Sequence, residues 1–176
     1  MSTATRIVAA WSALAFVLAG CGSNGVPPET WARSVCLAVK PWSTHIDASV
    51  TQARAKITSA SDPTQTKSEL VALFGGAQRA SAEAVAKVQK AGVPDADNGQ
   101  QVTAQFVAAL KAAEEQFGRA AAGVNALSTA DRSAFYSGVV KVGDQLSKDN
   151  NASSKQLRDV RSTTLERAFE RVPECR

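Results

Sequence analysis

The chain has 176 residues and a formal net charge of +4, with 44% hydrophobic and only 6% aromatic residues. This length suits a single domain, and so mild a charge gives no basis for nucleic-acid binding. Alanine is abundant, and no segment alternates apolar and polar residues with a period of two. These features exclude a β-rich fold and predict an all-α protein.

The N-terminal segment predicts an export signal. Arg6 precedes an uncharged, mostly apolar run over 7–20, which as a helix is about 21 Å long and too short for a bilayer core of about 30 Å. The run closes on Leu18-Ala19-Gly20-Cys21, which resembles a bacterial lipobox, where the cysteine takes diacylglycerol and palmitate and becomes the first mature residue. We therefore expect a signal peptide over 1–20 and a lipid anchor on Cys21 at the extracytoplasmic face of the cell membrane. An ordinary secretory signal with a chance cysteine is the alternative.

The composition also predicts where the domain begins. Residues 21–28 are small, polar and end in two prolines, which predicts a flexible tether before a domain over 29–176.

Cys36 and Cys175 lie at the two ends of this domain. Outside the cytoplasm such a pair usually forms a disulfide, and closing so long a loop contributes about 4–5 kcal/mol.

Apolar residues recur at steps of three and four along the domain, which is the period of an amphipathic helix. A proline inside the first helix, Pro41, predicts a bend. The sequence from Ser128 to Asp131 resembles a capping box at the start of the fourth helix. We expect helices at 29–60, 63–91, 100–127, from 130 onward and, after a polar interruption at 148–154, at 155–171.

The expected disulfide constrains the topology, because its Cα atoms must lie within about 7 Å. In an up-down bundle with short loops, the fourth helix returns to the end where the first begins. We therefore expect an up-down four-helix bundle whose last helix, over 130–171, is one broken rod. Five helices remain possible if a short fourth helix packs across one end. In the four-helix layout, the turns near 61–62 and 128–129 would lie at the end opposite the disulfide, where we expect a partner surface.

One resemblance covers most of the chain. The lipobox, the early helix with Trp31, Cys36 and Trp42, the alanine-rich helices and the closing segment 165–175 together resemble small exported lipoproteins of GC-rich Gram-positive bacteria. The resemblance implies an α-helical bundle in the cell envelope, and it carries over no catalytic residue.

No residue set predicts catalysis, metal binding or a cofactor. His45 has no nucleophile or second ligand near it in the sequence, and Glu114-Glu115 lack the Glu-x-x-His partners of bundle metal sites. The basic stripe of Lys155, Arg158 and Arg161 has two interpretations. It is either a contact for anionic headgroups and wall polymers or an ordinary charged face.

Trp31 and Trp42 also have two interpretations, because they flank Cys36. They either fill space beside the disulfide or form a ligand platform. Our leading hypothesis is a monomeric, non-enzymatic lipoprotein that contacts an envelope protein or a cell-wall polymer. The alternative is a protein that binds or senses a small apolar ligand or lipid between its helices.

Overall fold

The computed structural model describes residues 25–58, 61–156 and 162–176, with the backbone alone for 152–156. The elements in chain order are α1 (Pro28–Lys56), α2 (Pro63–Lys90), α3 (Gly99–Ala126), α4 (Arg132–Gln156), α5 (Thr163–Arg171) and the short 3-10 helix η1 (Pro173–Cys175). The expected all-α helical bundle is confirmed.

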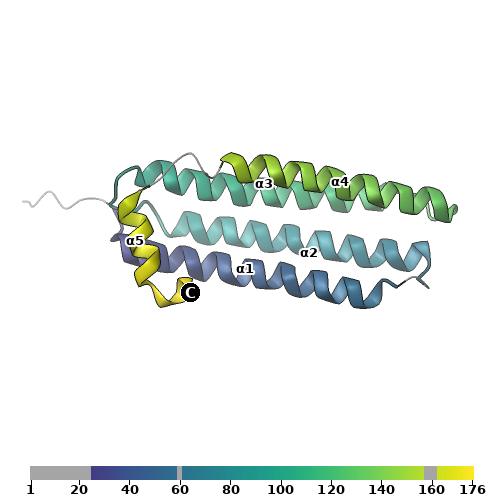
Figure 1. Ribbon diagram of the computed structural model, residues 1–176, viewed down its shortest axis with the longest axis horizontal. Helices are drawn as coiled ribbons and strands as arrows, with labels where there is room; N and C mark the ends of the chain where they lie inside the picture. The colour runs from purple at the N-terminus through teal and green to yellow at the C-terminus, as the bar shows by residue number, and fades with distance from the viewer. Residues whose placement is uncertain (1–24, 59–60, 157–161) are drawn as a thin grey trace, which may run out of the picture.

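The four long helices lie side by side and alternate in direction (Figure 1). One end of the bundle, here the disulfide pole, holds the start of α1, the α2–α3 loop, α5 and the C-terminus (Figure 1). The other end, here the far pole, holds the α1–α2 and α3–α4 turns. The turns near 61–62 and 128–129 therefore lie at the far pole, as expected.

The helix starts follow from short polar caps. The Asp62 side chain accepts a hydrogen bond from the Gln65 backbone N–H at 2.8 Å, ahead of Pro63 in the first turn of α2. At α4 the expected capping box is wrong, because Asp131 is the cap and accepts from the Ala134 N–H at 2.8 Å. The Ser128 hydroxyl accepts instead from the N–H of Ala130 within the turn.

Two helices tolerate residues that usually interrupt a helix. α1 runs unbroken through Pro41 and ends at Lys56, four residues before the expected end. α2 likewise runs unbroken through Gly75 and Gly76. The imidazole of His45 lies over Gly76, where an added Cβ would meet its Nε2 at 3.6 Å. This is an ordinary van der Waals distance, so α1 and α2 meet at this level through the His45 ring.

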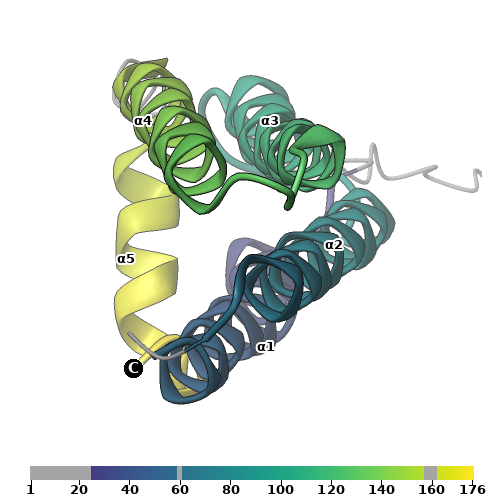
Figure 2. The same cartoon turned by 90° about the vertical axis from the view of Figure 1, so that its right-hand side faces the viewer.

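The expected single rod over 130–171 is wrong. α4 continues through 148–154, where Asp149 accepts from Gln145 one turn earlier and pairs with Arg119 on α3. The short element that packs across an end is α5, which crosses the disulfide pole at a steep angle to the long helices (Figure 2). Its buried Leu165 and Ala168 face the core, and this packing fixes its direction.

The last residues of the expected tether are held in place. Val26 donates its N–H to the Val93 carbonyl and accepts from the Asp95 N–H, each at 2.8 Å. Gly25 lies so close to Asp95 that an added Cβ would meet its backbone at 2.8 Å. The chain therefore enters α1 from a point fixed on the α2–α3 loop.

Candidate functional site

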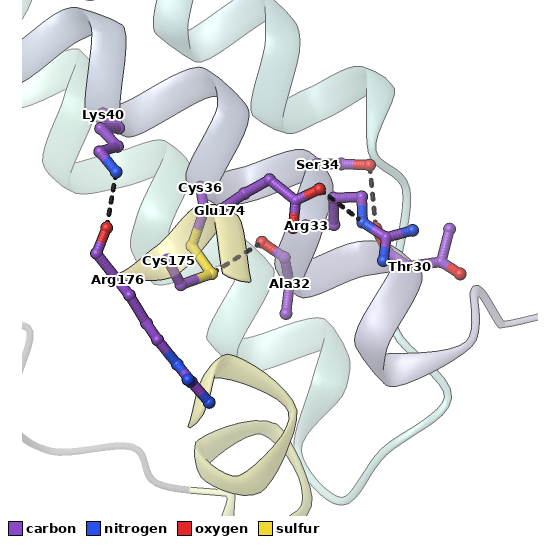
Figure 3. Close-up of a disulfide and its surroundings, with 9 residues drawn as sticks. All are labelled: Thr30, Ala32, Arg33, Ser34, Cys36, Lys40, Glu174, Cys175 and Arg176. Atoms are coloured by element: carbon purple, nitrogen blue, oxygen red, sulfur yellow. Dashed lines mark hydrogen bonds and ion pairs between the residues drawn. A yellow bond between two sulfur atoms is a disulfide. The ribbon is translucent and has the colours of Figure 1, made fainter. Parts of the chain in front are cut away.

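The Cys36–Cys175 disulfide is present, with the two Cα atoms 5.2 Å apart. It is flanked by an ion pair between Arg33 and Glu174 at 3.1 Å and by the Lys40 Nζ donating to the Arg176 carbonyl at 2.6 Å (Figure 3). The C-terminal segment is thus fastened along the outer side of α1 by one covalent bond and two polar contacts.

Trp31 forms the centre of the core at this pole. Its side chain is fully buried, and its ring packs edge-on against Phe106 of α3 and Phe169 of α5. The indole Nε1 donates to the Gly92 carbonyl at 2.9 Å, so its polar atom is satisfied. These contacts favour the space-filling interpretation of Trp31 over a ligand platform.

Trp42 has a different environment. It is half-buried between α1 and α2, and its indole Nε1 donates to Ser81 Oγ at 2.9 Å. The buried Ser81 hydroxyl in turn donates to the Ala77 carbonyl at 2.8 Å. The ring is therefore held in one orientation while part of it stays exposed.

The bundle is open along one side. No Cα atom of α1 lies within 8 Å of α4 among the residues described, although packed helices lie only about 8–10 Å apart from axis to axis. Figure 2 shows α5 crossing this side at the disulfide pole. We call the side between α1 and α4, beyond α5, the open side.

One stripe of α1 borders the open side. At the disulfide pole this stripe is covered, since Ala32 packs in an apolar cluster with Ala168, Val172 and Cys175. Steps of three and four carry the same stripe past α5 to Ser43, Ile46 and Val50, which are all partly exposed. α5 crosses the long helices at a steep angle, so it covers only a short length of this stripe near Ala32 (Figure 2). Among the described elements, α5 therefore leaves most of this stripe without a helix packed over it.

The facing stripe of α4 is set by Tyr136. Its hydroxyl donates to the Ser61 carbonyl at 3.0 Å and contacts Thr66 Oγ1 at 3.2 Å, so this stripe faces the start of α2. Helical spacing puts Val140 and Gly143 on the same stripe. Val140 is 61% exposed, and an added Cβ at Gly143 would meet no atom within 4 Å.

The large apolar side chains in the middle of the bundle are less buried than those at its two ends. Beyond the disulfide pole, several large apolar side chains on the amphipathic faces of α1 to α4 are all partly exposed rather than buried: Ile46, Val50, Leu70, Leu73, Phe117 and Val139. At the far pole itself, Val124 and Phe135 are buried. The open side is thus an apolar strip between two packed ends.

The remaining candidate residues do not gather into a site. His45 and Glu115 are exposed, Glu114 is half-exposed, and the described ranges contain no cluster of three His, Cys, Asp or Glu side chains that could hold a metal ion. Among the described residues, no helix is both long enough and apolar enough to cross a membrane. Leu18–Cys21, Lys155, Arg158 and Arg161 lie outside the part of the chain whose side chains are described.

One carboxyl group has a perturbed pKa. The Arg119 guanidinium, which donates to Asp149 at 3.0 Å, lowers the pKa of this carboxyl below its usual 3.8, and a hydrogen bond from Gln145 lowers it further. The carboxylate is on the surface of the α3–α4 pair, so the shift reflects a structural ion pair and not a reactive group.

The sequence did not indicate the open side. A possible signal is Val140, an apolar residue of α4 that lies away from the packed face formed by Phe135 and Val142. The chain matches no protein-family model, and comparison with curated proteins and with solved structures gives no significant match.

Proposed function

We propose that this chain is a lipid-anchored protein of the bacterial cell envelope that binds a partner helix on its open side and catalyses no reaction. The open side carries the proposal, because it exposes an apolar strip that a packed four-helix bundle would bury. The anchor rests on Leu18–Cys21, which resembles a lipobox, and the envelope location agrees with the Cys36–Cys175 disulfide.

An amphipathic helix is the partner that this surface fits. The protein already covers the first part of the same α1 stripe with one of its own, since α5 packs Ala168 and the following Val172 against Ala32. The uncovered part, bordered by Ile46, Val50 and Val140, continues that interface toward the far pole. A helix laid there would bury apolar residues spaced three and four apart.

Photocrosslinking in intact cells tests the binding surface. A photoreactive residue at position 140, on the rim of the open side, is expected to form an adduct with an envelope protein. The control is a photoreactive residue at position 141, which is next to 140 in the sequence but lines the hollow between α3 and α4. Gly143→Trp should abolish the adduct by occupying the open side, whereas Ala86→Trp, on the exposed surface of α2, should leave it unchanged.

The outcomes separate the two binding hypotheses. The partner-helix hypothesis is supported by a protein adduct in which the crosslinked residues of the partner are spaced three and four apart. An adduct with the mass of a lipid supports the alternative, an apolar ligand between the helices. Equal labelling at 140 and 141, no adduct at 140, or an adduct that survives Gly143→Trp contradicts both.

The anchor is tested separately. Cys21→Ala removes the thiol that would take the lipid, so the protein should leave the membrane fraction and appear in the soluble extracytoplasmic fraction. Retention of this variant in the membrane fraction would show that the anchor assignment is wrong.

A further inference from the structure

A hollow of about 300 Å³ lies between α1 and α2, on a different stripe of α1 from the open side. Trp42 and His45 of α1 form one wall, and Gly76 and Ala80 of α2 are part of the other. The small residues of α2 leave the space that larger side chains would fill. Its volume is at the lower end of the range for small-molecule sites, about 300–1,000 Å³.

The walls of the hollow are fixed. Trp42 cannot turn freely, because its indole N–H is bonded to Ser81, whose hydroxyl is bonded to Ala77. The His45 ring lies over Gly76 at the end of the hollow nearest the far pole. A ligand would therefore meet a preformed aromatic surface, and preorganisation of this kind favours binding.

Three charged residues of α2 surround the hollow. Arg79, Glu83 and Lys87 follow one another at steps of four along α2 and all line the hollow. In the described part of the chain none of the three takes part in an ion pair or a side-chain hydrogen bond. Their charged groups are therefore available to a ligand. Two cations and one carboxylate give the rim an excess positive charge.

We propose that this hollow binds a small organic anion, with the apolar part of the molecule against Trp42 and its carboxylate or phosphate group on Arg79. Arg79 lines the same hollow as Trp42 and His45, and its planar guanidinium suits a bidentate contact with either anion. Lys87, two turns further along α2, adds a longer-range attraction. This proposal is independent of the partner helix on the open side.

The test uses the purified full-length protein in mild detergent and benzoate as the probe. Benzoate should shift the indole N–H resonance of Trp42, and the buried Trp31 should respond far less. Benzamide, which has the same shape without the charge, should bind about tenfold more weakly or worse. Acetate, which lacks the ring, should also bind more weakly than benzoate.

Variants locate the site. Arg79→Gln should weaken benzoate binding about tenfold, and Lys87→Gln about two- to threefold. Lys90→Gln is the matched control, one turn away on α2 and outside the hollow, and should have no effect. Ala80→Leu should abolish binding by filling the space. The proposal is overturned if benzoate leaves the Trp42 resonance unmoved, if benzamide binds equally well, or if Arg79→Gln and Lys90→Gln behave alike.

Discussion

The two halves of α1 have the same apolar periodicity but different packing. In the first half, Trp31 and Val35 are fully buried, and the disulfide holds α5 and η1 against the outer stripe. In the second half, Ile46 and Val50 continue the pattern but remain partly exposed along the open side. The difference shows that an amphipathic stripe specifies a need for burial and does not specify the partner that supplies it.

The comparison separates stability from binding within one helix. The disulfide pole combines a covalent bond, a three-ring aromatic cluster and satisfied polar groups. The open side has no such covalent bond or three-ring cluster among the described residues, and its apolar residues keep part of their surface in water. We therefore expect stability to depend mainly on the disulfide pole, while substitutions on the open side change binding more than folding.

The largest expected effect comes from the disulfide. Cys36→Ala with Cys175→Ala opens a loop closed over a sequence separation of 139 residues, which in the chain-entropy model lowers the free energy of unfolding by about 5 kcal/mol. Urea unfolding followed by circular dichroism measures the loss, and reduction of the wild-type protein should reproduce it. Hydrogen exchange should speed up first in α5 and η1. Equal stability of the oxidised and reduced proteins would contradict this assignment.

The aromatic residues give the next largest contrast. Trp31→Ala removes a fully buried ring and a hydrogen bond, and should lower the free energy of unfolding by about 4 kcal/mol. Phe117→Ala removes a ring that is already partly exposed to solvent, and should lower the free energy of unfolding by roughly half as much. Both are measured by urea unfolding. Equal losses would mean that another molecule, such as a second copy of the chain, covers the open side in solution.

The features that the sequence predicted depend on local chemistry. Steps of three and four define each helix, and Asp62-Pro63 marks the start of α2, because these signals act within a few residues. The disulfide could be predicted because the two cysteines have few other uses in an exported domain. Short loops then determine the up-down order and the two poles.

The features that the sequence did not predict depend on contacts between distant residues. The polar stretch at 148–154 was expected to interrupt a helix, but Asp149 pairs with Arg119 across the helix pair, and the helix continues. The crossing of α5 depends on the docking of Phe169 beside Trp31 and Phe106. The open side depends on the distance between α1 and α4, which no periodicity encodes.

Two glycines on α4 give a smaller test of the open side. At Gly143 an added Cβ meets nothing within 4 Å, so Gly143→Ala should raise the free energy of unfolding by about 0.5–1 kcal/mol through helix propensity and chain entropy. At Gly138 an added Cβ would lie 2.5 Å from Leu127 Cδ2, so Gly138→Ala should lower it by about 1 kcal/mol. Thermal unfolding of both variants checks the opposite signs. Destabilisation by both would show that α4 packs against another surface at Gly143.

The smallest effect belongs to Asp149, on the packed side of α4. Its pKa is lowered in the folded protein by Arg119 and Gln145, so its stabilising contribution is present above the pKa of the unfolded state and disappears as the pH falls through the lower folded value. Asp149→Asn should therefore lower the melting temperature slightly at neutral pH, and the difference from wild type should shrink as the pH falls below the usual carboxyl pKa of 3.8 and the carboxylate becomes protonated. Glu115→Gln is the control, because Glu115 lies 3.7 Å from the same guanidinium but is 71% exposed, and it should change the melting temperature less. A difference for Asp149→Asn that persists unchanged into acid would mean that the side chain contributes through packing or helix propensity and not through its charge.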